Sequence, residues 1–561
     1  MKKLSFLLLA LAFALPVSAQ SVNAEYDRNA LTVISVHHND SYDAITDAYL
    51  RQNFPGGQKF DDNTVETRYI TVRYPRFEER EGADAKAFMN QHRADIYEAI
   101  QKEDVARQVI GKWFNRTPGG LMDLSLINKR ADYNATDQTY NIASAQALGE
   151  YLLHGEGVKL VDNSYILVVD HSVPVRRESR NNTNGKITNI NYSTHAIGYL
   201  YKVSFGDVQR KAVYEQWLYP TDDEATKQVK RENWNKIQFP LSGIDNVETL
   251  SSAGFDPNSR YGNENEAKNQ AIRGCAPAIM DKLEKHVEAW KVKTTIYKTH
   301  PIVSKVGTKE GLRNMSRFEV REYVLDNDGN VGSRRKGFVR ATTIANNTSV
   351  SRGKSPVSQF YQIAGTKLEP GMLLKEKKSL NLDVKALYYG GASKGFGAEA
   401  DYMFGMSNRG FCSHIRLGFT YFPYKAGLQG PADETGTFYY LKEQVSSADI
   451  RLGYGYGIRP FRQMEIIPGA YALFNYLDSK ITRSESELES EQSAMKKMGY
   501  GLEVGADINV TVFYPVKINA GAFYSLPFFG GEYWKAYTEI LERVGEKRLG
   551  FTYRVGLVYE F

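Results

Sequence analysis

Several alternating segments in the last third of the chain carry acidic and basic side chains on one of their two sides. The residues that would share one side are Lys385, Glu399, Asp401, Arg416, Asp449, Arg451, Glu465, Glu503, Asp507, Lys517 and Arg554. Because acids and bases are mixed, these groups could neutralise one another in a buried network. The same charges could instead line a path for ions, so their chemistry depends on the elements that carry them.

Histidines offer a second kind of chemistry in the front part of the chain. The stretch VHHND contains His37, His38 and Asp40, and Asp170 and His171 end an apolar run. Imidazole and carboxylate ligands suit zinc. Adjacent histidines on a strand point to opposite faces, however, so we expect separate histidines that are hydrogen-bonded or exposed. The sequence contains no phosphate-binding loop and no dinucleotide fingerprint, and we expect no cofactor.

Eight segments in the last third alternate apolar residues with small or charged ones. They are 380–388, 396–404, 415–421, 448–458, 464–476, 498–512, 516–524 and 549–561. A period of two is typical of β-strands. The segment 498–512 keeps its alternation over a length that strands of soluble sheets rarely need. We therefore expect eight consecutive strands.

The connections between these strands predict a barrel that spans a membrane. Connections 422–447, 477–497 and 525–548 are long, and they alternate with the short turns RPFRQ and FYP. Outer-membrane barrels have long outer loops and short periplasmic turns, and an even strand count puts both barrel ends in the periplasm. Apolar side chains must then face lipid while the charged set fills the interior. An eight-stranded barrel is just wide enough for its side chains, so we expect a plugged interior.

His414 lies on one of these predicted strands. Together with Asp401 or Glu399, it could form the acid–base group of a hydrolase embedded in the membrane. A filled interior leaves no room for a substrate, so we expect His414 to take part in salt bridges.

Residues 379–561 resemble the small eight-stranded outer-membrane barrels of the outer membrane protein A and X type. The ending YRVGLVYEF also resembles the signal read by the barrel-assembly machinery, carried here by Arg554, Gly556, Tyr559 and Phe561. The resemblance implies insertion by that machinery and contact with outer-membrane lipid. Familiar relatives with a periplasmic domain carry it after the barrel, whereas here most of the chain precedes the barrel. No residues match a peptidoglycan-binding role, so that role is not carried over.

The front of the chain divides into three predicted parts. Residues 1–19 have the features of a secretory signal peptide, with Lys2 and Lys3 before an apolar stretch. Residues 20–290 are predicted to form an α+β domain. Residues 291–373 are predicted to form a small β module and linker. We expect the barrel to lie in the cell outer membrane. If both ends of the barrel are periplasmic, the α+β domain also lies in the periplasm.

Individual elements of these parts follow from apolar spacing. Helices are predicted at 84–112, 142–153 and 264–290, strands at 164–173, 196–205 and 210–219, and a loop at 176–189. The module should contain strands at 318–324, 338–344 and 360–365. The basic stretch KEKKS at 375–379 is predicted to be a solvated linker, with contact to anionic lipid headgroups as the alternative.

The two cysteines, Cys275 and Cys412, are too few for a disulfide framework. They could still pair with each other, because the envelope is oxidising, and the bond would pin the domain to the barrel. Geometry decides whether they do. The net charge of +6 is too balanced to imply a nucleic-acid partner.

These features favour a non-enzymatic outer-membrane protein whose barrel anchors a large periplasmic domain, for envelope structure or for binding periplasmic or envelope proteins. Two other hypotheses stay open. One is a narrow porin-like transport protein that uses the charged interior. The other is an enzyme whose site lies in residues 21–290.

Overall fold

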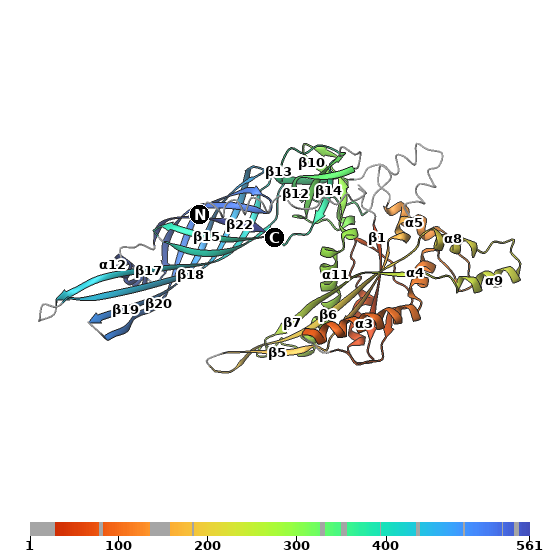
Figure 1. Ribbon diagram of the computed structural model, residues 1–561, viewed down its shortest axis with the longest axis horizontal. Coiled ribbons are helices and arrows are strands. Elements are labelled where there is room, and N and C mark those ends of the chain that lie inside the picture. The colour runs from red at the N-terminus through yellow and green to blue at the C-terminus, as the bar shows by residue number, and fades with distance from the viewer. Residues whose placement is uncertain are drawn as a thin grey trace.

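The computed structural model describes residues 28–561 except 78–81, 135–157, 182–183, 326–330, 349–355, 393, 433–437, 486–487, 530 and 544–548. Three parts follow one another along the molecule (Figure 1). The amino-terminal α+β domain lies at one end, the barrel lies at the other, and the small β module lies between them. The multidomain architecture predicted from the sequence is confirmed.

The amino-terminal domain is built on a seven-stranded mixed sheet. Its strands are β1 (Asn29–His37), β2 (Phe60–Asp62), β3 (Tyr69–Thr71), β4 (Ser164–His171), β5 (Val175–Arg180), β6 (Ile187–Val203) and β7 (Leu241–Phe255). The order is β2-β1-β4-β6-β5, with β3 beside β1 and β7 beside β6. Because β1 and β4 pair in parallel, their carboxyl ends lie side by side.

Helices cover both faces of this sheet. They are α2 (Asp43–Gln52), α3 (Gly82–Lys102), α4 (Val105–Trp113), α5 (Ser125–Asn134), α8 (Asp207–Glu215), α9 (Glu224–Trp234), α10 (Glu264–Arg273), α11 (Cys275–His286) and the 3-10 turn η1 (Glu288–Trp290). One core includes Ile34 of β1 and Ile96 of α3. The other includes Val33 of β1 and Ile279 of α11. No helix in the described part of the chain is long and apolar enough to cross a bilayer.

Several predicted elements of this domain are confirmed. The helix predicted at 84–112 is present as α3 and α4, which are separated near Asp104, a residue with a left-handed backbone. The helix predicted at 264–290 is present as α10, α11 and η1. The strand predicted at 164–173 is β4, which is buried along its whole length. The helix predicted at 142–153 lies outside the described residues.

Two predictions for this domain are wrong. The segment 210–219 is not a strand, because most of it belongs to α8. Asp207 in the first turn suits the positive end of a helix, and Val213 is the residue of α8 that packs into the core. The segment 176–189 is not a loop but mostly the β5–β6 hairpin. Its charged residues are tolerated because β5 is an edge strand with exposed side chains.

The β module is a seven-stranded sheet of order β8-β14-β11-β12-β13-β10-β9. Its elements are β8 (Lys293–Thr295), β9 (Lys298–Thr299), β10 (Ile302–Ser304), η2 (Thr308–Glu310), β11 (Arg317–Leu325), β12 (Val331–Thr343), β13 (Ser358–Gly365) and β14 (Leu373–Lys377). The three strands predicted in the module are confirmed as β11, β12 and β13. The linker prediction at 375–379 is wrong, because β14 occupies much of it. Lys375 and Lys378 pair with Glu288 and Glu284 of the amino-terminal domain.

The last third of the chain is a closed antiparallel barrel of eight strands, as predicted. They are β15 (Leu382–Gly391), β16 (Gly395–Phe404), β17 (Cys412–Ala432), β18 (Phe438–Phe461), β19 (Met464–Glu485), β20 (Leu488–Phe513), β21 (Val516–Phe529) and β22 (Gly550–Glu560). β22 pairs with both β21 and β15, and this pairing closes the barrel. The barrel therefore has no free strand edge.

The long connections differ from the loops predicted at 422–447, 477–497 and 525–548. In the first two, the paired strands β17–β18 and β19–β20 continue as hairpins that project past the barrel (Figure 1). The third contains the helix α12 (Gly531–Arg543). Apolar alternation marks only the part of a strand that faces lipid, whereas backbone pairing can continue beyond it without that pattern.

Candidate functional site: the barrel interior and its inner rim

The charged residues predicted to share one side do line the barrel interior. Every one of the eleven is at most 2 % exposed, although each carries an ionisable group. Their burial follows from strand geometry, because alternate residues of β15 to β22 point to opposite faces of the barrel wall. Such groups are tolerated away from water only when they are paired, so their contacts decide what the interior can do.

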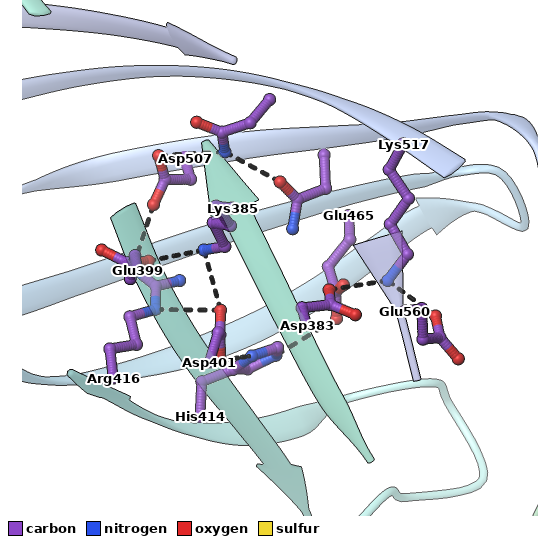
Figure 2. A network of polar contacts seen from close by, with 12 residues as sticks. Asp383, Lys385, Glu399, Asp401, His414, Arg416, Glu465, Asp507, Lys517 and Glu560 are labelled. Atoms are coloured by element: carbon purple, nitrogen blue, oxygen red, sulfur yellow. Dashed lines mark hydrogen bonds and ion pairs between the residues drawn. The ribbon is translucent and has the colours of Figure 1, made fainter. Parts of the chain in front are cut away.

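One part of the network is centred on Lys385 (Figure 2). Its ammonium lies 2.7 Å from a carboxylate oxygen of Glu399 and 2.9 Å from one of Asp401. His414 Nδ1 lies 2.8 Å from Asp401, and its Nε2 lies 3.3 Å from Glu465. The salt bridges expected for His414 are therefore present, and its ring is closed off from solvent.

Two arginines complete the centre of the interior. Arg416 lies 3.0 Å from a carboxylate oxygen of Asp507, which also pairs with Arg554. Arg554 lies 3.1 Å from Glu399. The hydroxyl of Tyr471 accepts hydrogen bonds from both arginines and donates one to Glu399. One continuous set of contacts therefore joins groups from β16, β17, β19, β20 and β22.

Further pairs fill the two ends of the interior. Toward the end away from the β module, Arg451 lies 2.9 Å from Glu503. Toward the end near the module, Lys517 lies 2.8 Å from Asp383 and 2.7 Å from Glu560. The predicted set omitted Asp383, Tyr471 and Glu560. Asp383 and Glu560 lie on the polar faces of the predicted strands 380–388 and 549–561, so the alternation itself could have identified them.

The outside of the barrel has the opposite character. Leu417, Ile450 and Leu557 each expose more than half of their side chains. Exposed aromatic side chains occur toward both ends of the strands, among them Tyr421 and Phe561. A water-soluble barrel buries its apolar residues, whereas a barrel in lipid exposes them and keeps charges inside. Residues 382–560 form a β-barrel of the outer-membrane type.

Three solved structures that resemble this chain each cover about a third of it, which is close to the share of the chain that the barrel occupies. The amino-terminal β-barrel domain of OprF from Pseudomonas aeruginosa is 11 % identical and covers 33 % of this chain and 100 % of its own, with a TM-score of 0.18. Ail of Yersinia pestis is 13 % identical over 32 % of this chain and 96 % of its own (TM-score 0.18). Neisserial surface protein A is 14 % identical over 32 % and 94 % (TM-score 0.16). No protein-family model matches the chain. No curated protein matches it either.

Helix α12 closes the end of the barrel away from the module. Its Trp534 is 3 % exposed and packs in one apolar cluster with Leu387, Phe422 and Leu477 of the barrel strands. The Trp534 indole N–H donates to the carbonyl oxygen of Tyr500. An apolar cap therefore lies above the charged interior.

The β module closes the other end, which we call the inner rim. Arg340 of β12 is 1 % exposed, and its guanidinium lies 2.6 Å from the carboxylate of Glu560 on β22. Burial opposes the charged guanidinium, but Glu560 and Tyr514 raise the pKa of Arg340 above its usual value. Arg317 donates to the Tyr514 hydroxyl at 2.5 Å. The module is thus joined to the barrel through buried charges, and no sequence pattern pointed to Arg340.

The disulfide that the sequence left open is not formed. Cys275 and Cys412 are both free and buried. Cys275 packs in the amino-terminal core with Ile279 of α11, and burial raises the pKa of its thiol to about 12. Cys412 packs at the inner rim with Phe338. Two cysteines in separate cores cannot reach the short Cα–Cα distance that a disulfide requires.

The amino-terminal histidines are not all separate, contrary to the prediction. His38 lies 3.0 Å from Asp170, and His92 of α3 lies 2.9 Å from the other oxygen of the same carboxylate. Burial alone would raise the pKa of Asp170, but these two imidazoles lower it. His37 points to the opposite face, because adjacent residues of an extended chain alternate, and it pairs with Asp47. The parallel pairing of β1 with β4 brings His38 and Asp170 together, and His92 was missed.

The sequence Gly391 to Gly395 matches the Gly-x-Ser-x-Gly pattern of many hydrolases. That motif needs a turn from a strand into a helix. Here the residues join the antiparallel strands β15 and β16. Ser393 itself lies outside the described residues.

The four residues of the predicted assembly signal divide into two kinds. Arg554 is fixed by its interior ion pairs, and Gly556 lies so close to β15 that an added Cβ would lie 2.1 Å from the Ala386 carbonyl oxygen. Tyr559 and Phe561 lie on the outer face, where their side chains are about half exposed. The first two residues therefore have structural roles, whereas the last two are available for recognition.

A charged contact between the amino-terminal domain and the module predicts a pH dependence. Glu284 lies 2.7 Å from Lys378 and 3.3 Å from Lys59. Burial would raise the pKa of Glu284, but the two ammonium groups lower it. A carboxylate whose folded pKa is depressed stabilises the protein above its unfolded pKa, about 4.3 for Glu. That stabilisation is lost as the pH falls through the folded pKa.

We therefore expect Glu284→Gln to lower the melting temperature of the amino-terminal domain at pH 7. The difference from the unmodified protein should shrink as the pH approaches 3. Melting followed by tryptophan fluorescence at both pH values measures this difference. An equal difference at pH 7 and pH 3 would contradict the assigned contact.

Proposed function

We propose that this protein is a non-enzymatic outer-membrane protein whose barrel anchors the amino-terminal domain in the periplasm. The domain would serve envelope structure or bind envelope partners there. The observation that carries the proposal is the buried Arg340–Glu560 pair, which joins the module to the barrel wall. An anchor needs a firm junction between its membrane part and its cargo, and this junction supplies one.

The buried acid–base groups of the amino-terminal domain support a non-enzymatic role. The side chains of His38, His92 and Asp170 have no exposed surface. Neither of two cavities in the described part of this domain is lined by any of them. Arg76 also lies 3.4 Å from Asp170 and 2.5 Å from Asp43. We infer that this cluster holds the carboxyl ends of β1 and β4 together.

Washing membranes with alkaline carbonate tests the anchor. The full chain should stay in the outer-membrane pellet, detected by an antibody against residues 28–290. Release of the intact chain into the supernatant would contradict the anchoring role.

The filled interior argues against the porin-like alternative. Charged pairs occupy the middle, α12 packs over one end, and Arg340 enters at the other. We expect no stepwise conductance when the purified protein is added to planar bilayers. Conductance steps that change on Arg451→Gln would favour the transport hypothesis instead.

The barrel-assembly machinery is a proposed partner, and the exposed ending is the surface it would recognise. Phe561→Ala should lower the amount of protein inserted in the outer membrane several-fold, because an exposed recognition residue is lost while few packing contacts change. Phe551→Ala removes a similarly exposed ring from the other end of β22 and serves as the control. Heat-modifiable migration on gels counts the folded fraction. Equal insertion of the two variants would show that the barrel-assembly machinery does not recognise Phe561.

A further inference from the structure

A basic groove lies on the amino-terminal domain, away from the barrel. Its volume is about 1130 Å³, and it lies between α4, the segment that joins β2 to β3, and the end of α9. A smaller cavity of about 220 Å³ adjoins it and shares Arg51, Thr64 and Arg68 with it. In Figure 1, α4 and α9 lie in the part of the molecule opposite the barrel, so the membrane does not cover the groove.

Positive charge dominates the lining of the groove. The cationic residues that line it are Arg51, Arg68, Arg107, Lys112 and Arg116, and the acidic ones are Glu66 and Asp104. Asp104 is already paired with Arg107. The remaining cations therefore outnumber the single acid left to balance them.

The cations are close enough to repel one another. Burial lowers the pKa of Arg116, and the neighbouring Arg107 and Arg231 lower it further. Burial also lowers the pKa of Lys112, with Arg130 and Arg68 adding to the effect. Like charges held together in one groove are stabilised by an anion that enters among them.

The framework of the groove is fixed by contacts that leave several of these charges facing outward. Gln108 of α4 donates to Thr67 at 2.8 Å and accepts from the Thr67 backbone N–H at 3.1 Å. Lys112, one helical turn further on, donates to the carbonyl oxygen of Thr64. The Arg116 guanidinium lies over the Trp234 ring at 4.6 Å, which limits its rotamers. The cationic positions are therefore set before any ligand arrives.

We propose that this groove binds a ligand that carries two or more neighbouring phosphate or carboxylate groups. Arginine presents a planar fork of donors that matches the paired oxygens of both groups, and three of the lining cations are arginines without a carboxylate partner in the described part of the chain. The proposed ligand rests on the proposed function, because it gives the chemistry of the envelope partner that the amino-terminal domain would bind.

Calorimetric titration of the full chain in detergent micelles tests the proposal. Tripolyphosphate and citrate are the two probes, because one presents neighbouring phosphate groups and the other presents neighbouring carboxylate groups. We expect at least one of them to bind at one site and to bind more weakly as salt is raised. Binding of tripolyphosphate alone assigns a phosphorylated ligand, and binding of citrate alone assigns a carboxylated one.

Matched variants locate the binding. Arg68→Gln combined with Arg116→Gln should weaken it at least tenfold. Arg313→Gln combined with Arg462→Gln removes two exposed arginines outside the groove and should change it less than twofold. The double variant Arg68→Lys with Arg116→Lys keeps the positive charges but loses the planar guanidinium groups. Its affinity should lie between those of the glutamine variant and the control variant. Such a partial loss would also show that weaker binding does not come from a folding defect.

Two results would overturn the proposal: neither probe binds, or the groove and control variants lose binding equally. Either result would leave the anchoring role intact, because binding is measured on purified protein. A failure of the membrane placement would equally leave the binding result unchanged.

Discussion

Replacing Lys385 by Met should destabilise the barrel by about 3–5 kcal/mol, the range found when one partner of a buried ion pair is removed. The ammonium of Lys385 has no exposed surface and lies within 3 Å of both Glu399 and Asp401. Its loss leaves excess negative charge where water cannot enter. Guanidinium unfolding in detergent, followed by the heat-modifiable migration of the barrel on gels, measures the change in the free energy of unfolding.

Lys394→Met provides the matched control for this variant. Lys394 lies in the exposed connection between β15 and β16, so the same substitution there should change stability by less than about 0.5 kcal/mol. Adding Asp401→Asn to Lys385→Met should recover part of the loss, because it removes one of the carboxylates left without its cation. A cost below about 1 kcal/mol for Lys385→Met would mean that water reaches the interior, and the plugged barrel would then be wrong.

Replacing Glu560 by Gln should loosen the module from the barrel. Arg340 and Lys517 would both lose their contact to this carboxylate, and Arg340 would keep a buried charge without its counter-ion. We expect amides of β12 to exchange with solvent more readily, with a loss of protection of about 3 kcal/mol. Hydrogen exchange of the full chain in micelles, read by mass spectrometry, gives this value for β12 peptides.

The same strand offers a control for the inner rim. Arg334 of β12 pairs with Glu322 at the surface, where its side chain is 64 % exposed, so Arg334→Met should cost at most about 1 kcal/mol. Arg340→Met should cost several times more. When Arg340→Met and Glu560→Gln are combined, the loss should be smaller than the sum of the two. Equal effects of Arg334→Met and Arg340→Met would show that the buried pair does not hold the module.

The barrel could be predicted because a strand that spans a membrane requires a simple pattern of residues. Lipid on one side and packed charges on the other force alternation, so interior residues such as Arg416 and Asp507 were identified by position alone. Tyr471 was missed because an aromatic side chain on such a strand is expected to face lipid, whereas its hydroxyl hydrogen-bonds inside. The hairpins past the barrel were missed because no lipid imposes alternation there.

The amino-terminal domain was less predictable because its contacts join distant segments. His38 and Asp170 meet through the parallel pairing of β1 with β4, which no local pattern specifies. The basic groove unites α4 with residues before α3 and with Trp234 of α9. The inner rim likewise depends on how the module seats against the barrel, so Arg340 resembles any other charged strand residue in the sequence.

Protease treatment of intact cells tests the central claim most directly. A protease site inserted at 433–437, in the connection between β17 and β18, reports the outer side, and an antibody against residues 28–290 reports the amino-terminal domain. We predict that the inserted site is cut on intact cells, while the amino-terminal domain survives until the outer membrane is breached. Cutting of the amino-terminal domain on intact cells, with the inserted site protected, would contradict the account and place the domain at the cell surface.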